Sequence, residues 1–447
     1  MKVCSLYGAG YYYLPGTEIC LKVGGYVRYQ ATFGPGNSVS FGPFNGLGSR
    51  FTRLDSTDFQ QRVRTVLTID TRQQTGYGTL RTYMLLGWTH DTNGAIGSPG
   101  SSIYFTRGFI QVAGFTFGKA SSFFDIYPNA AFGYNVGSMY VPDTGDAGQI
   151  LATYTAQFGN GFSASIGIEA SRRASVVYTG TASSYSIGAV PTQNSLGGVA
   201  AGVSGLPDVV GNLRVDQAWG SVLAAFALHD TSGGYYGTSE TTGHPSNNWG
   251  WAATIGGIFN LPMLAPGDKF SFQFVYSEGA VRYVSLSTNV VSKFNGATVG
   301  WGFAEDGVYA AAGAVQNTTA WGLAAGFEHL WSPALRTSLY GSYMEVTHNA
   351  VAIAAICAMT NTNPVFVAGA CNPNYSTWVL GSRTQWEPVK GWIMGVDVLY
   401  ASLKSATANA VGTATLTANG AKPAGVYAVA DQSAWVFTFR TQRDYHP

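Results

Sequence analysis

The chain has 447 residues, of which 46% are hydrophobic, 14% aromatic and 11% charged, and its formal net charge is +1. Soluble proteins carry about 25% charged residues, so this composition does not suit a helical enzyme, and the lack of a basic tract argues against a nucleic-acid partner. The sequence contains no run of about 18 apolar residues, which excludes helical membrane spans.

The first residues, Met1-Lys2-Val3-Cys4, do not form a secretory signal, because no apolar core follows the lysine. A protein of the cell envelope is made with such a signal. We therefore expect this chain to be a processed or truncated form from which the signal peptide is absent.

Alternation of apolar and polar residues recurs along the whole chain. In Gln60–Asp70, Val63 and Leu67 point to one side of an extended chain, whereas Arg62 and Arg64 point to the other. Stretches of about ten to fourteen residues with this alternation predict β-strands. The predicted strands are residues 21–33, 59–72, 76–90, 101–113, 114–120, 149–158, 162–171, 212–218, 219–229, 249–261, 268–280, 319–331, 335–347, 375–388, 391–402 and 432–445.

The connections between these strands alternate between very short turns and long polar loops. The short reversals are predicted at residues 73–75, 159–161, 262–267, 332–334 and 389–391. The long loops are predicted near residues 34–58, 121–148, 172–211, 230–248, 281–318, 348–374 and 403–431. A barrel standing in a membrane needs this rhythm, since its chain reverses near the periplasmic surface and is free to extend on the outside.

A chain that crosses lipid without helices must close its sheet, because unpaired backbone groups at a strand edge are not tolerated in hydrocarbon. We therefore predict an all-β fold in which residues 1–447 form a single transmembrane antiparallel β-barrel of about 16 strands. Aromatic residues near strand ends, such as Trp88, Trp331 and Trp392, fit the two membrane–water boundaries. The alternative is that they fill the core of a soluble sandwich, as in an adhesin or a lectin.

The four cysteines fall into two local pairs, Cys4 with Cys20 and Cys357 with Cys371. Neither pair has the spacing or the neighbouring histidines of a metal site. Two local disulfides fit the oxidising envelope, and the first of them would tie down an N-terminal segment, residues 1–20. Four reduced, buried thiols are the alternative.

Several stretches are similar to one known family. They are Val3–Gly10, Pro15–Arg28, Tyr77–Tyr83, Phe117–Asp125 and, more loosely, Phe437–Arg443. They resemble the outer-membrane porins of alphaproteobacteria, the rhizobial and Brucella type. The resemblance implies a sixteen-stranded barrel that assembles as a homotrimer among the lipid and lipopolysaccharide of the bacterial outer membrane. It also implies passive diffusion of ions and small hydrophilic solutes.

Strand alternation predicts which basic side chains face a water-filled lumen. On the first strand, Lys22 and Arg28 lie on the side opposite to Val23 and Val27. A charge facing lipid would cost about 2–4 kcal/mol at mid-bilayer, which favours the inward direction. The predicted lumen-facing basic residues are Lys22, Arg28, Arg62, Arg64, Arg81 and Arg107. Ion pairs between neighbouring strands are the alternative role for the arginines.

The segment 121–148 is the candidate constriction loop, and it carries Asp125, Asp143 and Asp146. In porins the third loop folds into the barrel and sets carboxylates opposite a basic wall, so the resemblance assigns that role to this segment. A transverse field between the two rows would orient dipolar solutes. The alternative is that these acids are surface charges of the loop.

The sequence predicts a general diffusion porin, with no cofactor and no metal site. A channel specific for an anion such as phosphate, or for a sugar, is an alternative kept open by the cluster of arginines. A barrel enzyme is a further alternative, but it would need a converging Ser/His/Asp set or paired acids. His90-Asp91 and His229-Asp230 are the only suggestive pairs, and each is read as the start of a loop, so no catalytic residue is predicted.

Overall fold

The computed structural model describes most of the chain, and nearly all of the described part is β-strand. The described residues are 3–34, 44, 59–92, 100–127, 129–135, 140–141, 148–180, 206–285, 290–359, 370–407, 412–416 and 423–445. Within them, seventeen strands form the main sheet. The two-residue strand β1 (Tyr12–Tyr13) pairs only with the start of the first long strand, which leaves sixteen strands in the barrel wall.

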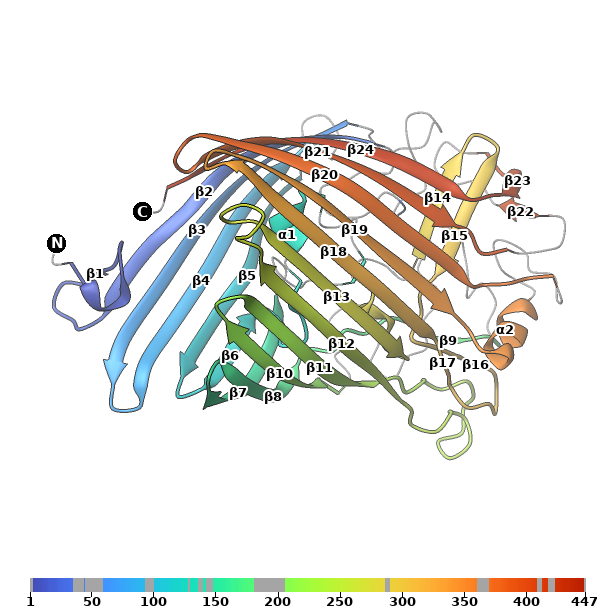
Figure 1. The fold of residues 1–447 in the computed structure, drawn as a ribbon. Coiled ribbons are helices and arrows are strands. Elements are labelled where there is room, and N and C mark those ends of the chain that lie inside the picture. Colours follow the sequence, from blue (N-terminus) through green and yellow to red (C-terminus); the bar gives the residue numbers. More distant parts are fainter. Residues whose placement is uncertain are drawn as a thin grey trace.

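The sixteen strands pair antiparallel around a closed barrel (Figure 1). They are β2 (Cys20–Phe33), β3 (Phe59–Thr75), β4 (Gly78–Asp91), β5 (Gly100–Val112), β6 (Phe115–Ala120), β7 (Gln149–Gly159), β8 (Phe162–Glu169), β10 (Asp208–Gln217), β11 (Gly220–Asp230), β12 (Trp249–Asn260), β13 (Lys269–Glu278), β18 (Thr319–Ser332), β19 (Leu335–Thr347), β20 (Tyr375–Val389), β21 (Trp392–Lys404) and β24 (Gln432–Asp444). Pairing of β2 with β24 closes the ring and leaves no free edge. The predicted fold class is thereby confirmed.

Each predicted strand corresponds to a strand of the barrel, but one predicted turn is wrong. Residues 73–75 belong to β3, and the chain reverses at Gly76-Tyr77 instead. Gly78 there has a φ of +98°, which favours glycine, and the Thr75 hydroxyl donates to the carbonyl of Gly78 at 2.7 Å. The reversal therefore lies two residues beyond the glutamines that looked like a polar turn.

The long-loop end of the barrel carries additional structure that the alternation pattern did not predict. Two small sheets form there from segments distant in sequence (Figure 1). One contains β14 (Val290–Asn295), β15 (Thr298–Phe303), β22 (Thr413–Leu416) and β23 (Gly425–Val429), and the other contains β9 (Val176–Tyr178), β16 (Gly307–Tyr309) and β17 (Gln316–Asn317).

The helical elements of the described chain are short. They are η1 (Ser5–Tyr7), α1 (Asn129–Phe132), η4 (Val281–Tyr283) and α2 (Ala350–Cys357). The side chain of Asn349 caps α2 by accepting a hydrogen bond from the Ala352 N–H at 2.9 Å. No helix in the described ranges is long and apolar enough to cross a membrane.

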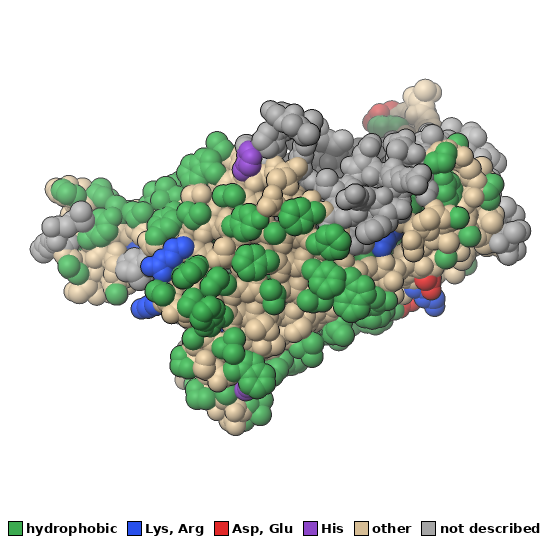
Figure 2. Space-filling model, turned by 90° about the horizontal axis from the view of Figure 1, so that it is seen from above, with side chains coloured by type: hydrophobic (Ala, Val, Ile, Leu, Met, Phe, Trp, Pro, Cys, Tyr) green, Lys and Arg blue, Asp and Glu red, His purple; other side chains and the backbone are tan. Residues whose placement is uncertain are grey.

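The two faces of the wall differ as the alternation predicts. On β2 the outward Val27 is 47% exposed, whereas the inward Gln30 is 1% exposed. On the face of the molecule seen in Figure 2, hydrophobic side chains are spread over the barrel wall with few charges among them. An apolar outer face suits the acyl chains of a bilayer, and it directs the polar half of every strand inward.

Both predicted disulfides are present. Cys4 is bonded to Cys20 with their Cα atoms 5.9 Å apart, and Cys357 is bonded to Cys371 with their Cα atoms 5.7 Å apart. The first joins the N-terminal segment to the start of β2, and the second joins the end of α2 to the segment before β20.

Replacing Cys357 and Cys371 together by alanine is expected to destabilise the protein by about 3 kcal/mol, because the bond closes a loop of about 15 residues in the unfolded chain. This loss is measured from the urea concentration at which half of the protein no longer migrates on a gel as the folded, heat-modifiable band. Mass mapping of non-reduced peptides checks both pairings. An unchanged midpoint, or four free thiols in protein from native membranes, would contradict the prediction.

Candidate functional site

Arginines on the first strands of the barrel share its inner face. Arg28 on β2 lies directly opposite Arg64 on β3 in the strand register, and the neighbouring Val27 and Val63 point outward with 47% and 45% of their surface exposed. The predicted arginines of β4 and β5, Arg81 and Arg107, follow on the same side, because the register is regular from Arg81 opposite Gln111 to Leu85 opposite Arg107.

Two of the predicted arginines are neutralised by acids that were not among the predicted site residues. Arg62 holds Asp91 through two hydrogen bonds of 2.5 and 2.6 Å, and its side chain is 7% exposed. Arg81 binds Asp70 at 2.9 Å, and Arg72 binds the same carboxylate at 3.3 Å. Ion pairing between strands, the alternative role, is therefore what these arginines do.

Arg28 and Arg64 form no ion pair with any residue that the structure describes. Their hydrogen bonds go to neutral acceptors, the Gln442 side-chain oxygen for Arg28 at 2.7 Å and the Thr89 hydroxyl for Arg64 at 3.2 Å. The guanidinium of Arg64 also lies 4.7 Å from the ring centre of Tyr104. Within the described part of the chain, no ion pair offsets the positive charges of these two arginines at the inner face.

Lys22 and Arg107 contact segments other than neighbouring strands. The Lys22 ammonium donates to the carbonyl of Ala9 at 3.4 Å and thus joins β2 to the N-terminal segment. Arg107 donates to the Ser121 hydroxyl at 2.9 Å and reaches the start of the loop after β6.

The loop after β6 enters the barrel and packs on the inner faces of strands from β8 to β24. We call its described part the inner loop; it comprises residues 121–127, 129–135 and 140–141. The amide of Ile126 donates to the side chain of Gln273 on β13 at 3.0 Å, and the amide of Tyr134 donates to Asp397 on β21 at 2.5 Å. These contacts attach the inner loop to strands more than a hundred residues away in sequence.

Further contacts extend the attachment to neighbouring strands and to η4. The Tyr140 amide donates to the Ser342 hydroxyl on β19 at 2.9 Å, and the Val141 amide donates to the Val284 carbonyl at 2.7 Å. Arg383 on β20 donates to the carbonyl of Ala131. The inner loop is therefore held along much of its described length.

Glycines on the wall let the inner loop approach closely. A Cβ atom on Gly326 of β18 would lie 2.7 Å from the ring of Phe132, and one on Gly256 of β12 would lie 2.6 Å from Ile126. Neither position has room for a side chain. α1 accordingly contacts β18 and β19 directly.

Asp125 does not have the role expected for it. It forms an ion pair with Arg172 at 2.9 Å, and the two side chains are only 3% and 2% exposed. Burial alone would lower the pKa of Arg172, but Asp125, Tyr283 and Glu169 together outweigh burial and raise that pKa above its ordinary value. Asp125 is thus an anchor of the inner loop and not a carboxylate facing water across from the basic strands. Asp143 and Asp146 lie outside the described residues.

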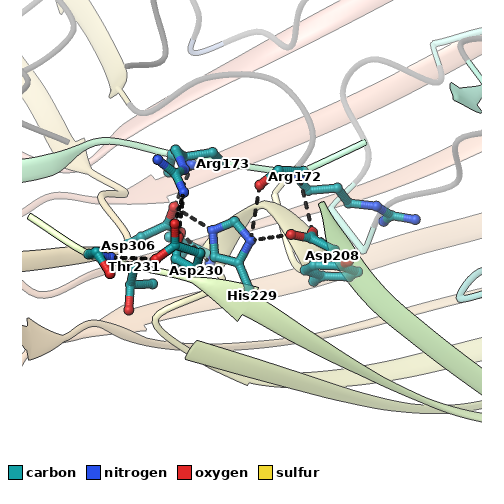
Figure 3. Close-up of polar contacts among 12 residues, drawn as sticks. Arg172, Arg173, Asp208, His229, Asp230, Thr231 and Asp306 are labelled. Carbon is teal, nitrogen blue, oxygen red and sulfur yellow. Dashed lines mark hydrogen bonds and ion pairs between the residues drawn. The ribbon is translucent and has the colours of Figure 1, made fainter. Parts of the chain in front are cut away.

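Arg172, the partner of Asp125, also belongs to a larger buried polar cluster (Figure 3), because its backbone amide donates to Asp208 at 3.0 Å. Arg173, next to Arg172, binds Asp230 at 2.8 Å. His229 lies between Asp208 at 2.7 Å and Asp306 at 3.3 Å. His229-Asp230, one of the pairs suggestive of a catalyst, is thereby used to tie β11 to the segments that follow β8 and β15.

Sequence reasoning missed several basic residues of the inner face, among them Lys269, Arg336, Arg383 and Arg440. Strand alternation could have located Arg440, because outward Trp435 and Phe437 on β24 predict an inward residue at each even position. No group of three or more His, Cys, Asp or Glu side chains within the described ranges is arranged to hold a metal ion.

Comparison with known proteins gives matches over most of the chain. The family described as "Porin subfamily" matches residues 1–438. Porin Omp2b of Brucella melitensis is 29% identical over 311 residues, which are 68% of this chain and 70% of that protein. Porin Omp2b of Brucella neotomae is 29% identical over 314 residues, covering 68% of this chain and 71% of its own length.

Solved structures share the fold at low sequence identity. The outer membrane channel DcaP of Acinetobacter baumannii superposes with a TM-score of 0.60 and 12% identity, covering 97% of this chain and 99% of its own. OmpF of Salmonella typhi gives a TM-score of 0.50 and 10% identity, covering 97% and 100%. At these identities the likeness concerns the barrel fold alone.

Replacing Asp125 with asparagine is expected to cost about 3–5 kcal/mol, because it leaves the buried Arg172 without its partner. Urea unfolding in detergent micelles measures the loss, and protease cleavage within the inner loop should increase. Asp216 with Arg214 supplies the matched control: their side chains are 49% and 37% exposed, so D216N should cost about 0–1 kcal/mol. Equal costs for D125N and D216N would contradict the anchoring role.

Proposed function

The chain belongs to the porin subfamily, and from this premise we propose how its lumen controls what passes. The protein is a general diffusion porin of the bacterial outer membrane, a passive water-filled channel for ions and small hydrophilic solutes. Porins are channels and not enzymes, and we assign no catalytic role to any residue.

We propose that the inner loop forms the constriction of this channel. The supporting observation is its attachment to the inner faces of β13, β19, β20 and β21. A loop held there takes up part of the lumen cross-section and leaves the passage between itself and β2–β5. Pore size then depends on a segment that cannot swing aside without breaking buried contacts.

The fixed charges along the passage would come mainly from Arg28 and Arg64. Both lie on strands facing the inner loop, and neither has an acidic partner among the described residues. Charges act through water over about 8 Å at physiological salt, so uncompensated groups beside a narrow passage influence ions strongly. Arg62 and Arg81 contribute less, because their fields are offset by Asp91 and Asp70.

We also propose that the channel works as a homotrimer embedded in lipid and lipopolysaccharide, as its resemblance to alphaproteobacterial porins implies. Unheated gel electrophoresis and chemical crosslinking of the detergent-extracted protein should give a species of three chains. A monomer under both conditions would remove the trimer from the proposal and leave the single-barrel channel unaffected.

Replacing Arg28 and Arg64 together by alanine should shift the reversal potential in a salt gradient towards cation preference. The shift should grow at low salt, where screening is weaker. Removing Arg62 and Asp91 together is the control, because it deletes one charge of each sign. Planar-bilayer recording measures both variants, and equal shifts in the two would contradict the assignment of selectivity to Arg28 and Arg64.

Deleting residues 129–135 should raise single-channel conductance and admit larger sugars in liposome swelling, because it removes part of the proposed constriction. Deleting residues 238–242, an exposed stretch between β11 and β12, gives a control of similar size outside the inner loop. If both deletions left conductance and the size limit unchanged, the inner loop would not be the constriction.

A further inference from the structure

A hollow of about 490 Å³ opens inside the barrel, between α1 and the end that carries the short turns. Five basic side chains line it, and Glu328 is the one carboxylate among its described lining residues. The five are Arg28, Lys269, Arg336, Arg383 and Arg440. They come from β2, β13, β19, β20 and β24, so strands distant in sequence converge on one space.

Glu328 neutralises only part of this charge. It accepts a hydrogen bond from Arg383 at 2.8 Å and lies 4.0 Å from Arg336. Arg336 also binds Glu387, at 3.4 Å. Glu328 and Glu387 therefore offset positive charge only on the side of the hollow where Arg336 and Arg383 lie.

The other side of the hollow keeps its positive charge. Arg440 donates to the side-chain oxygen of Gln30 at 2.9 and 2.5 Å and to the carbonyl of Tyr134 at 3.2 Å. Arg28 donates to the Gln442 side chain at 2.7 Å. All these acceptors are neutral, and neither guanidinium group forms an ion pair with a residue that the structure describes.

The arginines of the hollow are also held in fixed directions. The guanidinium of Arg440 lies 4.1 Å from the ring centre of Tyr134, and that of Arg383 lies 5.3 Å from it. Stacking on one ring limits how far the two groups can move apart. Tyr134 is itself fixed through its amide by Asp397, so the inner loop orients this part of the basic cluster.

We propose that this hollow binds small oxyanions carrying two or more negative charges as they pass through the channel. Guanidinium forks match the geometry of phosphate and carboxylate oxygens. A surplus of cations over one carboxylate favours a multivalent anion over chloride. The inference rests on the proposed function, since the ligand reaches the hollow only through an open lumen.

The position of the hollow makes the binding asymmetric. It lies on the short-turn side of the inner loop, where Lys269 and Arg336 begin their strands next to short turns. An anion added to that side meets the basic cluster before the constriction. An anion added to the long-loop side must pass the inner loop first.

Planar-bilayer recording with inorganic phosphate tests the proposal, with potassium chloride as the conducting salt. Phosphate should lower chloride conductance in a saturable way, and at lower concentration from the short-turn side. Sulfate and succinate should act likewise if charge and oxygen geometry suffice, whereas acetate should not. A conductance independent of phosphate would overturn the site, while absence of any channel in chloride alone would instead overturn the porin function.

Variants identify the residues responsible. R28Q with R440Q should raise the half-saturating phosphate concentration about tenfold or more, because charge-assisted hydrogen bonds are lost. R214Q is the matched control, since Arg214 is paired with Asp216 on β10 and does not line the hollow, and it should leave phosphate block unchanged. K269Q, at an exposed position, gives a second test without disturbing packed arginines, and it should weaken phosphate block measurably. If the half-saturating phosphate concentration were the same in R28Q/R440Q, K269Q and R214Q, the assignment of phosphate binding to the hollow would be overturned.

Discussion

Complete pairing of backbone groups is the constraint on which the rest of this structure depends. Lipid offers no hydrogen bonds to an unpaired strand, so the sheet must close on itself. The pairing of β2 with β24 provides that closure, from Tyr26 opposite Asp444 to Phe33 opposite Phe437. Once the ring is closed, strand alternation sends half of the side chains into lipid and half into the lumen. The polar chemistry of the channel is then concentrated on one inner surface.

That inner surface uses its charges in two different ways. Buried pairs such as Asp125 with Arg172 attach the inner loop and the segments around it, and they have almost no contact with water. Arg28 and Arg64, which form no ion pair with a described residue, remain at the inner face. Under the proposed function, anchoring and ion selection are thus separate tasks of separate residues, although both sets include arginines.

The sequence predicted the barrel well because the physical rule behind it is local. A period of two, repeated between turn residues, located each strand of the barrel within a few residues, and the wrong turn at 73–75 failed only because glutamines there continue the strand. The cysteine pairs were equally local, separated by 16 and 14 positions.

Partners and loop paths could not be predicted in the same way. Asp125 was expected to face the basic strands, but its partner Arg172 lies 47 positions away and is brought to it by the course of two loops. Arg440 could have been found from alternation, yet its place beside Gln30 depends on barrel closure, which joins positions 410 apart. The small sheets at the long-loop end depend on similar distant pairings.

The central claim is that successive residues of a wall strand face water and lipid in turn. The single-cysteine substitutions R64C and V63C test this claim directly, since the native cysteines of the described chain are all in disulfides. A charged, water-soluble thiol reagent added to open channels in a planar bilayer should change the conductance of R64C and leave that of V63C unchanged. Equal responses at both positions, or a response of V63C alone, would contradict the account.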